Sequence, residues 1–129
     1  MKDFRGTGIA MITPFTATGE VDYNALESLV EQYIQAGIDF LVVLGTTAET
    51  ATLSKQEQEV IAQKVVEINA GRIPLMLGKG GNNTAALVND LKTADLTGYS
   101  AILSVCPYYN RPNQEGVFQH FSAVAEASS

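Results

Sequence analysis

Four short runs of apolar, largely β-branched residues recur along the chain, and each precedes a longer segment whose apolar residues lie three or four positions apart. The short runs are typical of strands, and the longer spacing is typical of helices with one apolar face. The runs occupy residues 8–13, 39–44, 73–78 and 101–105. Their spacing of about 30 residues is that of a βα unit. The pattern therefore predicts four βα units in succession.

The four helices are predicted from apolar spacing together with capping residues. In the first helix the apolar positions are Leu26, Leu29, Val30, Tyr33 and Ile34, and Gly37 ends it. The second is expected to begin at Ser54, because Ser54 and Glu57 have the spacing of a capping box. Asn83 and Asn113 are the expected N-caps of the third and fourth helices. These last two helices are expected to carry Leu87, Leu91 and Ala94, and Val117, Phe118, Phe121 and Val124.

The strand predicted at residues 40–44 is apolar at every position, without the alternation of a sheet that has one face in water. Both of its faces must therefore be covered, which favours a parallel sheet with helices outside. Either an open doubly wound sheet or a closed eight-stranded barrel fits this repeat. Residues 14–19, after the first strand, contain neither the Gly-x-Gly-x-x-Gly pattern nor a Walker loop, so a nucleotide-binding open sheet loses support.

Composition narrows the class of protein. The chain has 129 residues, of which 46% are hydrophobic and 17% are charged, as expected for one globular unit. The net charge of −6 argues against a nucleic-acid partner, and no apolar run approaches the roughly 18 residues of a membrane span. The single cysteine, Cys106, and an N-terminal segment without the apolar core of a signal peptide lead us to expect a cytoplasmic protein.

Polar residues follow two of the predicted strands at their carboxyl ends. Thr46 and Thr47 come after the second strand, and Tyr108, Tyr109 and Arg111 come after the fourth. In βα-repeat proteins the carboxyl ends of the strands meet on one face, where catalytic groups are found. We therefore expect these two polar clusters to share one face.

Four segments together resemble those of the dihydrodipicolinate synthase family of pyruvate-dependent lyases. They are GIAMITPF at 8–15, GTTAETATL at 45–53, GRIP at 71–74 and PYYNRP at 107–112, and they follow the family's order along the chain. The Gly-Thr-Thr and Tyr-Tyr-Asn-Arg-Pro segments at this separation carry most of the specificity. Ala48 departs from the family's pattern, because a glycine is more usual at that position.

The resemblance implies a TIM (β/α)8 barrel about twice as long as this chain. The chain then corresponds to a parallel (βα)4 half of the barrel, and residues 1–129 form an incomplete domain. In the family, a lysine on the sixth strand forms a Schiff base with pyruvate, and the resulting enamine attacks aspartate 4-semialdehyde. That strand would follow residue 129, so the isolated chain is expected to be inactive. No metal and no organic cofactor is expected.

The resemblance also implies roles for residues of both polar clusters. Thr46 matches the threonine that links two tyrosines in a proton relay, and Thr47 would help to hold the pyruvate carboxylate. Tyr109 matches the relay tyrosine that reaches across a dimer interface into the neighbouring site. Tyr108 lies at that interface in the family. A homo-oligomer is therefore expected.

The family's feedback site, where present, binds lysine in these same loops and helices. Its positions in this chain are Thr50, Ala51, Lys55, Gln58, Gly80, Asn82, Ala86 and Tyr108. Ala86 replaces a glutamate that would pair with the effector's amine, and Lys55 places a fixed positive charge where the family has a histidine. Because like charges repel, we expect weak or absent inhibition by lysine.

Several of these residues have a plainer interpretation. Thr46 and Thr47 can simply cap a turn, and the two tyrosines can be packing residues. Lys79 follows the third strand, where a Schiff-base amine is conceivable, but its glycine-rich loop is expected to leave it hydrated. His120 is expected at the surface or at its boundary.

Two alternatives to the leading function stay open from the sequence. One is another pyruvate-dependent aldolase of the same superfamily, of the N-acetylneuraminate lyase type. The other is a noncatalytic fragment that folds by association. Half a barrel has two unpaired sheet edges and an apolar inner face, so we expect the isolated chain to associate.

Overall fold

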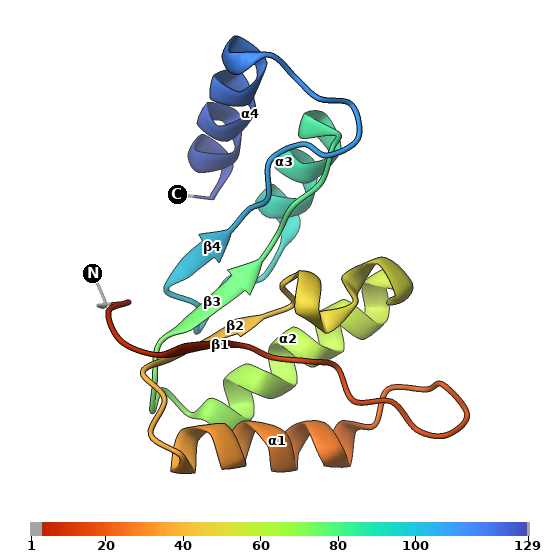
Figure 1. The fold of residues 1–129 in the computed structure, drawn as a ribbon, viewed down its shortest axis with the longest axis vertical. Helices are drawn as coiled ribbons and strands as arrows, with labels where there is room; N and C mark the ends of the chain where they lie inside the picture. The colour runs from red at the N-terminus through yellow and green to blue at the C-terminus, as the bar shows by residue number, and fades with distance from the viewer. Residues whose placement is uncertain (1–3, 129) are drawn as a thin grey trace.

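A computed structural model of the protein, described here for residues 4–128, contains one parallel sheet (Figure 1). Its strands are β1 (Gly8–Ala10), β2 (Phe40–Val43), β3 (Leu75–Gly78) and β4 (Ala101–Leu103), paired in the order β1-β2-β3-β4. Each strand is shorter than the apolar run that predicts it. Residues 1–3, which belong to the N-terminal segment considered above, and residue 129 lie outside the described residues. The predicted parallel repeat is confirmed.

The helices are α1 (Tyr23–Gln35), α2 (Lys55–Asn69), α3 (Thr84–Thr93) and α4 (Gln114–Ala127). The capping box of Ser54 and Glu57 is present, and the side chains of Asn83 and Asn113 accept backbone hydrogen bonds as N-caps of α3 and α4. Ala94, which we expected within the third helix, is instead its C-cap with extended backbone. The local start signals therefore place the helices correctly.

The main core lies between the outer face of the sheet and the first two helices. Leu41, Val43, Leu75 and Leu77 are each at most 1% exposed. They belong to one cluster with four residues of α1 and α2, namely Leu26, Val30, Ile61 and Val65. Figure 1 shows α1 and α2 side by side along this part of the sheet.

A smaller cluster holds α3 and α4 together. It contains Leu87 and Leu91 of α3 and Val124 of α4. Ile102 of β4 packs against this cluster and against the main core, so it joins the two. The four βα units are therefore packed as two pairs of helices on one continuous sheet.

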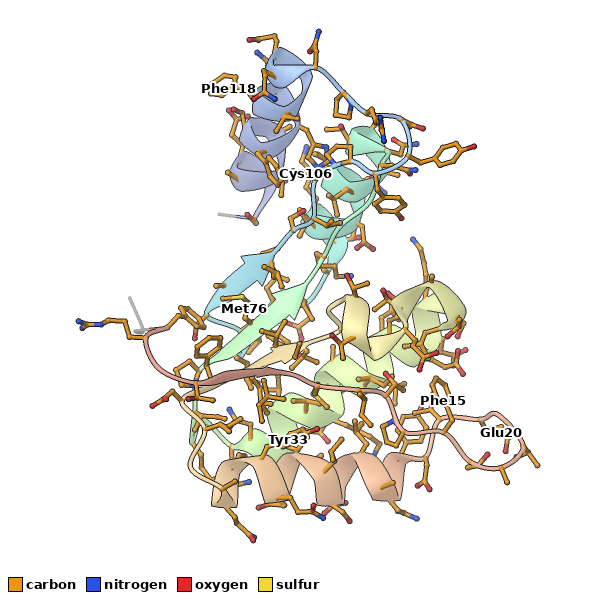
Figure 2. All side chains as sticks on the ribbon, viewed as in Figure 1. Phe15, Glu20, Tyr33, Met76, Cys106 and Phe118 are labelled. Atoms are coloured by element: carbon orange, nitrogen blue, oxygen red, sulfur yellow. The ribbon has the colours of Figure 1, made fainter. Side chains whose placement is uncertain are left out.

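The inner face of the sheet is covered only in part. Ala10, Val42, Met76 and Ala101 are in register, so their side chains lie in one row on this face. Met76 of this row is labelled in Figure 2. Val42 is 8% exposed. The expectation that both faces are covered thus holds for β2, but Leu103 of β4 is 46% exposed on the inner face. The residues that would face it across a closed barrel are not among those described.

The buried stripe of α4 differs from the predicted one. His120 is 2% exposed, and its Nδ1 lies 2.8 Å from the hydroxyl oxygen of Thr84 on α3. Phe118, predicted on the apolar face, is 64% exposed. Residues four apart share one helix face, so His120 and Val124 together form the stripe that packs on α3. The expected surface position of His120 is therefore wrong.

None of the helices between residues 4 and 128 is long and apolar enough to cross a membrane.

We expect the isolated chain to associate through its inner face. Ile12, Leu103 and Val105 are 48%, 46% and 45% exposed, and β1 and β4 each have one edge without a strand partner among the described residues. Light scattering should therefore give a mass above that of one chain. Replacing Ile12 and Leu103 by lysine should shift the population toward the monomer, because charge on the face opposes its burial.

The control replaces Phe118 by lysine, because this aromatic is even more exposed, at 64%, but lies on α4 instead of the sheet. A monodisperse monomer of the unmodified chain would contradict the prediction. An equal loss of association in the Phe118 variant would show that the inner face is not the driving surface.

Candidate active site

The two threonines after β2 lie in a tight turn. Thr46–Ala48 forms one turn of 3₁₀ helix, and Thr50–Thr52 forms a second. Ala48 is 1% exposed, whereas Thr46 and Thr47 are exposed. The N-cap of the first 3₁₀ turn is Gly45, which makes no side-chain capping bond. The turn therefore forms with a glycine at its N-cap, and it leaves both threonines exposed.

The neighbouring strands β1 and β3 contact this turn from both sides. The hydroxyl of Thr13, just beyond β1, donates a hydrogen bond of 2.8 Å to the carbonyl oxygen of Ala48. At the end of β3, Gly78 lies so close that a Cβ atom there would be 2.1 Å from the carbonyl oxygen of Leu44. Only glycine fits at that approach. The turn is thus located by the sheet as well as by its own hydrogen bonds.

The second polar cluster follows β4. Tyr109 and Arg111 have positive φ angles of 69° and 45°, and Tyr109 is 95% exposed. At that exposure its ring contacts almost nothing in its own chain, which argues against the packing interpretation. Tyr108 is 56% exposed, and its carbonyl oxygen accepts a hydrogen bond of 3.4 Å from the side chain of Asn82. The loop therefore presents both rings at the surface.

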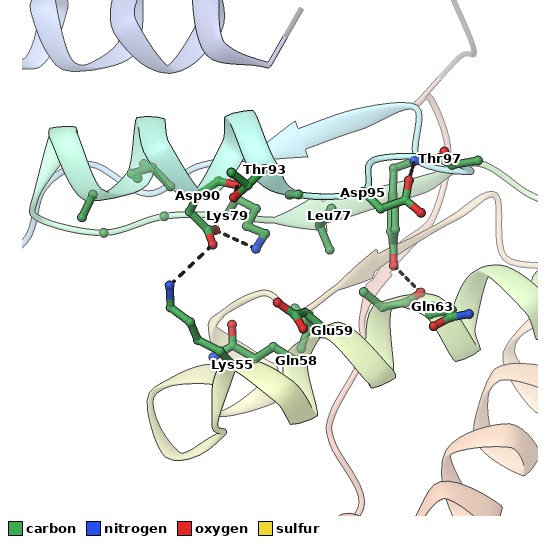
Figure 3. A pocket seen from close by; sticks show the side chains of 18 of the residues that line it. Lys55, Gln58, Glu59, Gln63, Leu77, Lys79, Asp90, Thr93, Asp95 and Thr97 are labelled. Carbon is green, nitrogen blue, oxygen red and sulfur yellow. Dashed lines mark hydrogen bonds and ion pairs between the residues drawn. The ribbon is translucent and has the colours of Figure 1, made fainter.

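A cleft of about 870 Å³ separates α2 from α3 near the same edge (Figure 3). Five of the eight predicted effector positions line it, namely Lys55, Gln58, Gly80, Asn82 and Ala86. Thr50 and Ala51 belong to the second 3₁₀ turn, which precedes α2. The structure thus brings most of these positions together, and their role in binding an effector stays a prediction.

Gln58 is already engaged within the chain. Its side-chain nitrogen donates hydrogen bonds of 3.1 Å to the carbonyl oxygens of both Thr50 and Leu53. These bonds close the second 3₁₀ turn onto α2. Gln58 therefore has a structural task at its position in the cleft.

Lys79 is not hydrated as expected. Its side chain is 16% exposed, and its Nζ lies 2.7 Å from an oxygen of Asp90 on α3 (Figure 3). The other oxygen of Asp90 lies 3.9 Å from the Nζ of Lys55, whose side chain is 86% exposed. The amine of Lys79 is engaged by a carboxylate, which is not the state of a free nucleophile.

Sequence reasoning missed Thr13, Gly78 and Asp90. Thr13 is a polar residue at the end of an apolar strand, immediately before Pro14, and this placement was a usable sign of a specific contact. Gly78 ends a strand, where a glycine often marks a close approach of backbone. Nothing in the sequence pairs Asp90 with Lys79. Between residues 4 and 128, no three His, Cys, Asp or Glu side chains gather closely enough to hold a metal ion.

Consecutive parallel βα units, with hydroxyl and phenol groups on the turns at their carboxyl edge, define half of a βα-barrel protein. The relatives of the chain specify which barrel. The chain belongs to the dihydrodipicolinate synthetase family, whose sequence model matches residues 3–129.

Curated relatives are similar along almost the whole chain. The chain is 55% identical over 128 residues to the 4-hydroxy-tetrahydrodipicolinate synthase of Flavobacterium psychrophilum, and 55% identical over 125 residues to that of Azobacteroides pseudotrichonymphae. These matches cover 99% and 97% of this chain but only 44% and 42% of the relatives. The chain therefore spans less than half the length of the relatives that it matches.

Solved structures of dihydrodipicolinate synthases are similar to this chain over the same share of their length. Dihydrodipicolinate synthase from Acinetobacter baumannii, solved in complex with pyruvate, has a TM-score of 0.92 and 40% identity, over 97% of this chain and 43% of that one. The enzyme from Cyanidioschyzon merolae, solved with lysine bound, has a TM-score of 0.89 and 39% identity, over 98% and 44%. The described fold is thus half of a dihydrodipicolinate synthase barrel.

Gly78→Ala should lower the stability of the chain, because its Cβ would meet the Leu44 carbonyl oxygen at 2.1 Å. Overpacking of this kind costs about 1–3 kcal/mol or more. The control is Gly81→Ala in the same loop, where an added Cβ meets nothing within 4 Å. Thermal unfolding of both variants checks the prediction, and equal melting temperatures would refute it.

Proposed function

We propose that this chain is the N-terminal half of a 4-hydroxy-tetrahydrodipicolinate synthase, which condenses pyruvate with aspartate 4-semialdehyde in lysine biosynthesis. The observation that carries the proposal is the turn at Thr46 and Thr47. It presents two exposed threonines at the carboxyl edge of a barrel sheet, within a chain 55% identical to a synthase of that name. Residues 1–129 form an incomplete domain in this proposal, and the reaction belongs to the complete enzyme.

The chemistry divides between the two halves of the barrel. A lysine amine from the later half condenses with the ketone of pyruvate and releases water, and the enamine carbon then attacks the aldehyde. Thr46 passes a proton between tyrosines, because a hydroxyl can donate and accept at once. Thr47 holds the pyruvate carboxylate. This half therefore supplies proton transfer and orientation, and the isolated chain is inactive.

The exposure of Tyr109 supports a homo-oligomer. A tyrosine that is 95% exposed has its ring almost free of contacts within its own chain, and its positive φ holds it on a constrained backbone. In the proposed enzyme it crosses a dimer interface and joins the relay of the neighbouring subunit, with Tyr108 packed at that interface. The free, exposed Cys106 is compatible with the reducing cytoplasm in which we place the enzyme.

A chimera tests the function directly. Residues 1–129 replace the aligned part of the Flavobacterium psychrophilum enzyme, which supplies the remainder of the barrel. We expect the chimera to condense pyruvate with aspartate 4-semialdehyde and to form one borohydride-trapped pyruvate adduct, on a lysine beyond residue 129. The isolated chain should form none, Lys79 included. A stoichiometric adduct on Lys79 would place the nucleophile in this half and refute the proposed division.

Within the chimera, Thr46→Val and Tyr109→Phe should each lower kcat by about 100-fold, because proton transfer by a positioned group contributes about that much. The matched control is Thr18→Val, which removes an exposed hydroxyl from the loop after β1 and should leave kcat unchanged. A folded chimera that turns over N-acetylneuraminate instead favours the aldolase alternative. A folded chimera inactive on both substrates favours the noncatalytic one.

We expect lysine to inhibit the chimera weakly or not at all. Lys55 places a positive charge at the cleft, Ala86 offers no carboxylate, and Gln58 is engaged by backbone carbonyls. The pair of substitutions Lys55→His and Ala86→Glu should lower the inhibitory lysine concentration by about tenfold, the effect of about 1.4 kcal/mol.

The control pair, Lys92→His and Ala85→Glu, makes the same change of charge at exposed positions of α3. It should leave the lysine titration unchanged. Strong inhibition of the unmodified chimera would overturn the prediction.

A further inference from the structure

We propose that Thr13 is a positioning residue that sets the place of the Thr46 and Thr47 hydroxyls through its hydrogen bond to Ala48. The inference rests on the proposed function, because it assigns Thr13 a task in the same site. Thr13 itself does not reach the reacting atoms in this account. It acts on the turn that carries them.

The bond is short, buried and directional. Thr13 Oγ1 lies 2.8 Å from the Ala48 carbonyl oxygen, and the two residues are 4% and 1% exposed. A buried carbonyl that loses its donor has no water to replace it. The contact joins residues 35 positions apart, so it links β1 to the turn after β2.

The 3₁₀ turn transmits the position of Ala48 to the threonines. Within it, the Ala48 amide donates to the Gly45 carbonyl oxygen at 3.0 Å, and the Glu49 amide donates to the Thr46 carbonyl oxygen at 3.1 Å. Thr46, Thr47 and Ala48 therefore move as one short unit. Fixing the Ala48 carbonyl fixes the direction in which the two preceding side chains leave the backbone.

The turn needs an external support. Leu44 and Glu49, which flank it, both have φ angles of 55°, and neither is a glycine. Such backbone conformations persist only when the surroundings hold them. Gly78 limits the turn on the side of β3 by close contact, which prevents approach but supplies no attraction. Thr13 supplies the attractive contact from the opposite neighbour.

Thr13 is itself held in place by the sheet and by its neighbour Pro14. The pairing of β1 with β2 continues past the strand, because the Met11 amide donates to the Val42 carbonyl oxygen at 3.1 Å. A residue before proline is confined to extended backbone. The backbone at Thr13 is therefore fixed, and this sets the position from which its hydroxyl reaches Ala48.

The test uses the chimera and three substitutions. Thr13→Val keeps the shape and removes the donor, and Thr13→Ser keeps the donor and removes a methyl group. Tyr99→Phe is the matched control. Its hydroxyl donates at 2.9 Å to the carbonyl oxygen of another alanine, Ala62, before β4 instead of at the carboxyl edge. Burial raises the pKa of Tyr99, so its hydroxyl stays protonated and donating in the assay.

In Thr13→Val we expect kcat/KM for pyruvate to fall by about tenfold or more, since a displacement near 1 Å at a site costs up to about 100-fold. The KM for aspartate 4-semialdehyde should change little, because the proposal assigns Thr46 and Thr47 no contact with that substrate. Thr13→Ser should restore kcat/KM to within about twofold, since it restores the donor. Tyr99→Phe should lower the melting temperature and leave both kinetic constants unchanged.

Three outcomes would overturn the inference. They are wild-type kinetics in a folded Thr13→Val variant, a Thr13→Ser variant that is as impaired as Thr13→Val, and an equal loss of kcat/KM in Tyr99→Phe. If Thr13→Val does not fold, Thr13→Ser decides, because retained activity supports the role of the donor and lost activity refutes it.

Failure of the proposed function can be distinguished from failure of the Thr13 inference, because it would give a wild-type chimera that folds but is inactive. Amide hydrogen exchange then still tests Thr13. The amides of Ala48 and Glu49 should exchange faster in Thr13→Val and at the wild-type rate in Tyr99→Phe. Unchanged exchange at both amides in Thr13→Val would refute the inference without any assay of activity.

Discussion

Burial of the outer face of the sheet under α1 and α2 is the constraint on which the rest of the structure depends. Leu41 and Val43 must both face the helices, and Leu75 and Leu77 must do so on the next strand. A slip of one residue would turn these side chains to the opposite face, so the core fixes the register of every pairing. Fixed register in turn fixes the height at which each strand ends. The turn after β2 therefore meets Gly78, the last residue of β3, at one level.

Backbone strain is concentrated at the edge that this register creates. Leu44, Glu49, Tyr109 and Arg111 all have positive φ angles, and all lie in the turns that follow β2 and β4. Two of them flank a turn that neighbouring strands support from within the chain. Tyr109 has no comparable cover, because it is 95% exposed. The contrast supports the proposed homo-oligomer, in which Tyr109 joins the site of a neighbouring subunit.

The sequence predicts what depends on neighbours along the chain. The βα repeat follows from apolar spacing, and the start of α2 follows from a serine and a glutamate three positions apart. Contacts between distant segments were not predictable, because no local pattern encodes them. His120 is buried because α3 offers Thr84, 36 positions away, and Lys79 is shielded because Asp90 lies one strand-to-helix connection later. The family resemblance identified Thr46, Thr47 and Tyr109 as candidates, but the hydrogen bond from Thr13 to the turn of Thr46 and Thr47 emerges only from the fold.

The partly open inner face has a consequence for folding of the protein during its synthesis on the ribosome. The outer core joins consecutive βα units, so Leu41 and Leu75 can be buried as soon as β3 has emerged. In the longer relatives, the row that contains Met76 gains its opposing residues only when later strands are made. Between those two moments, the outer core of the half-barrel is already packed, but its apolar inner face is still exposed and can associate with other chains. That interval is when a nascent chain of this fold most needs a chaperone.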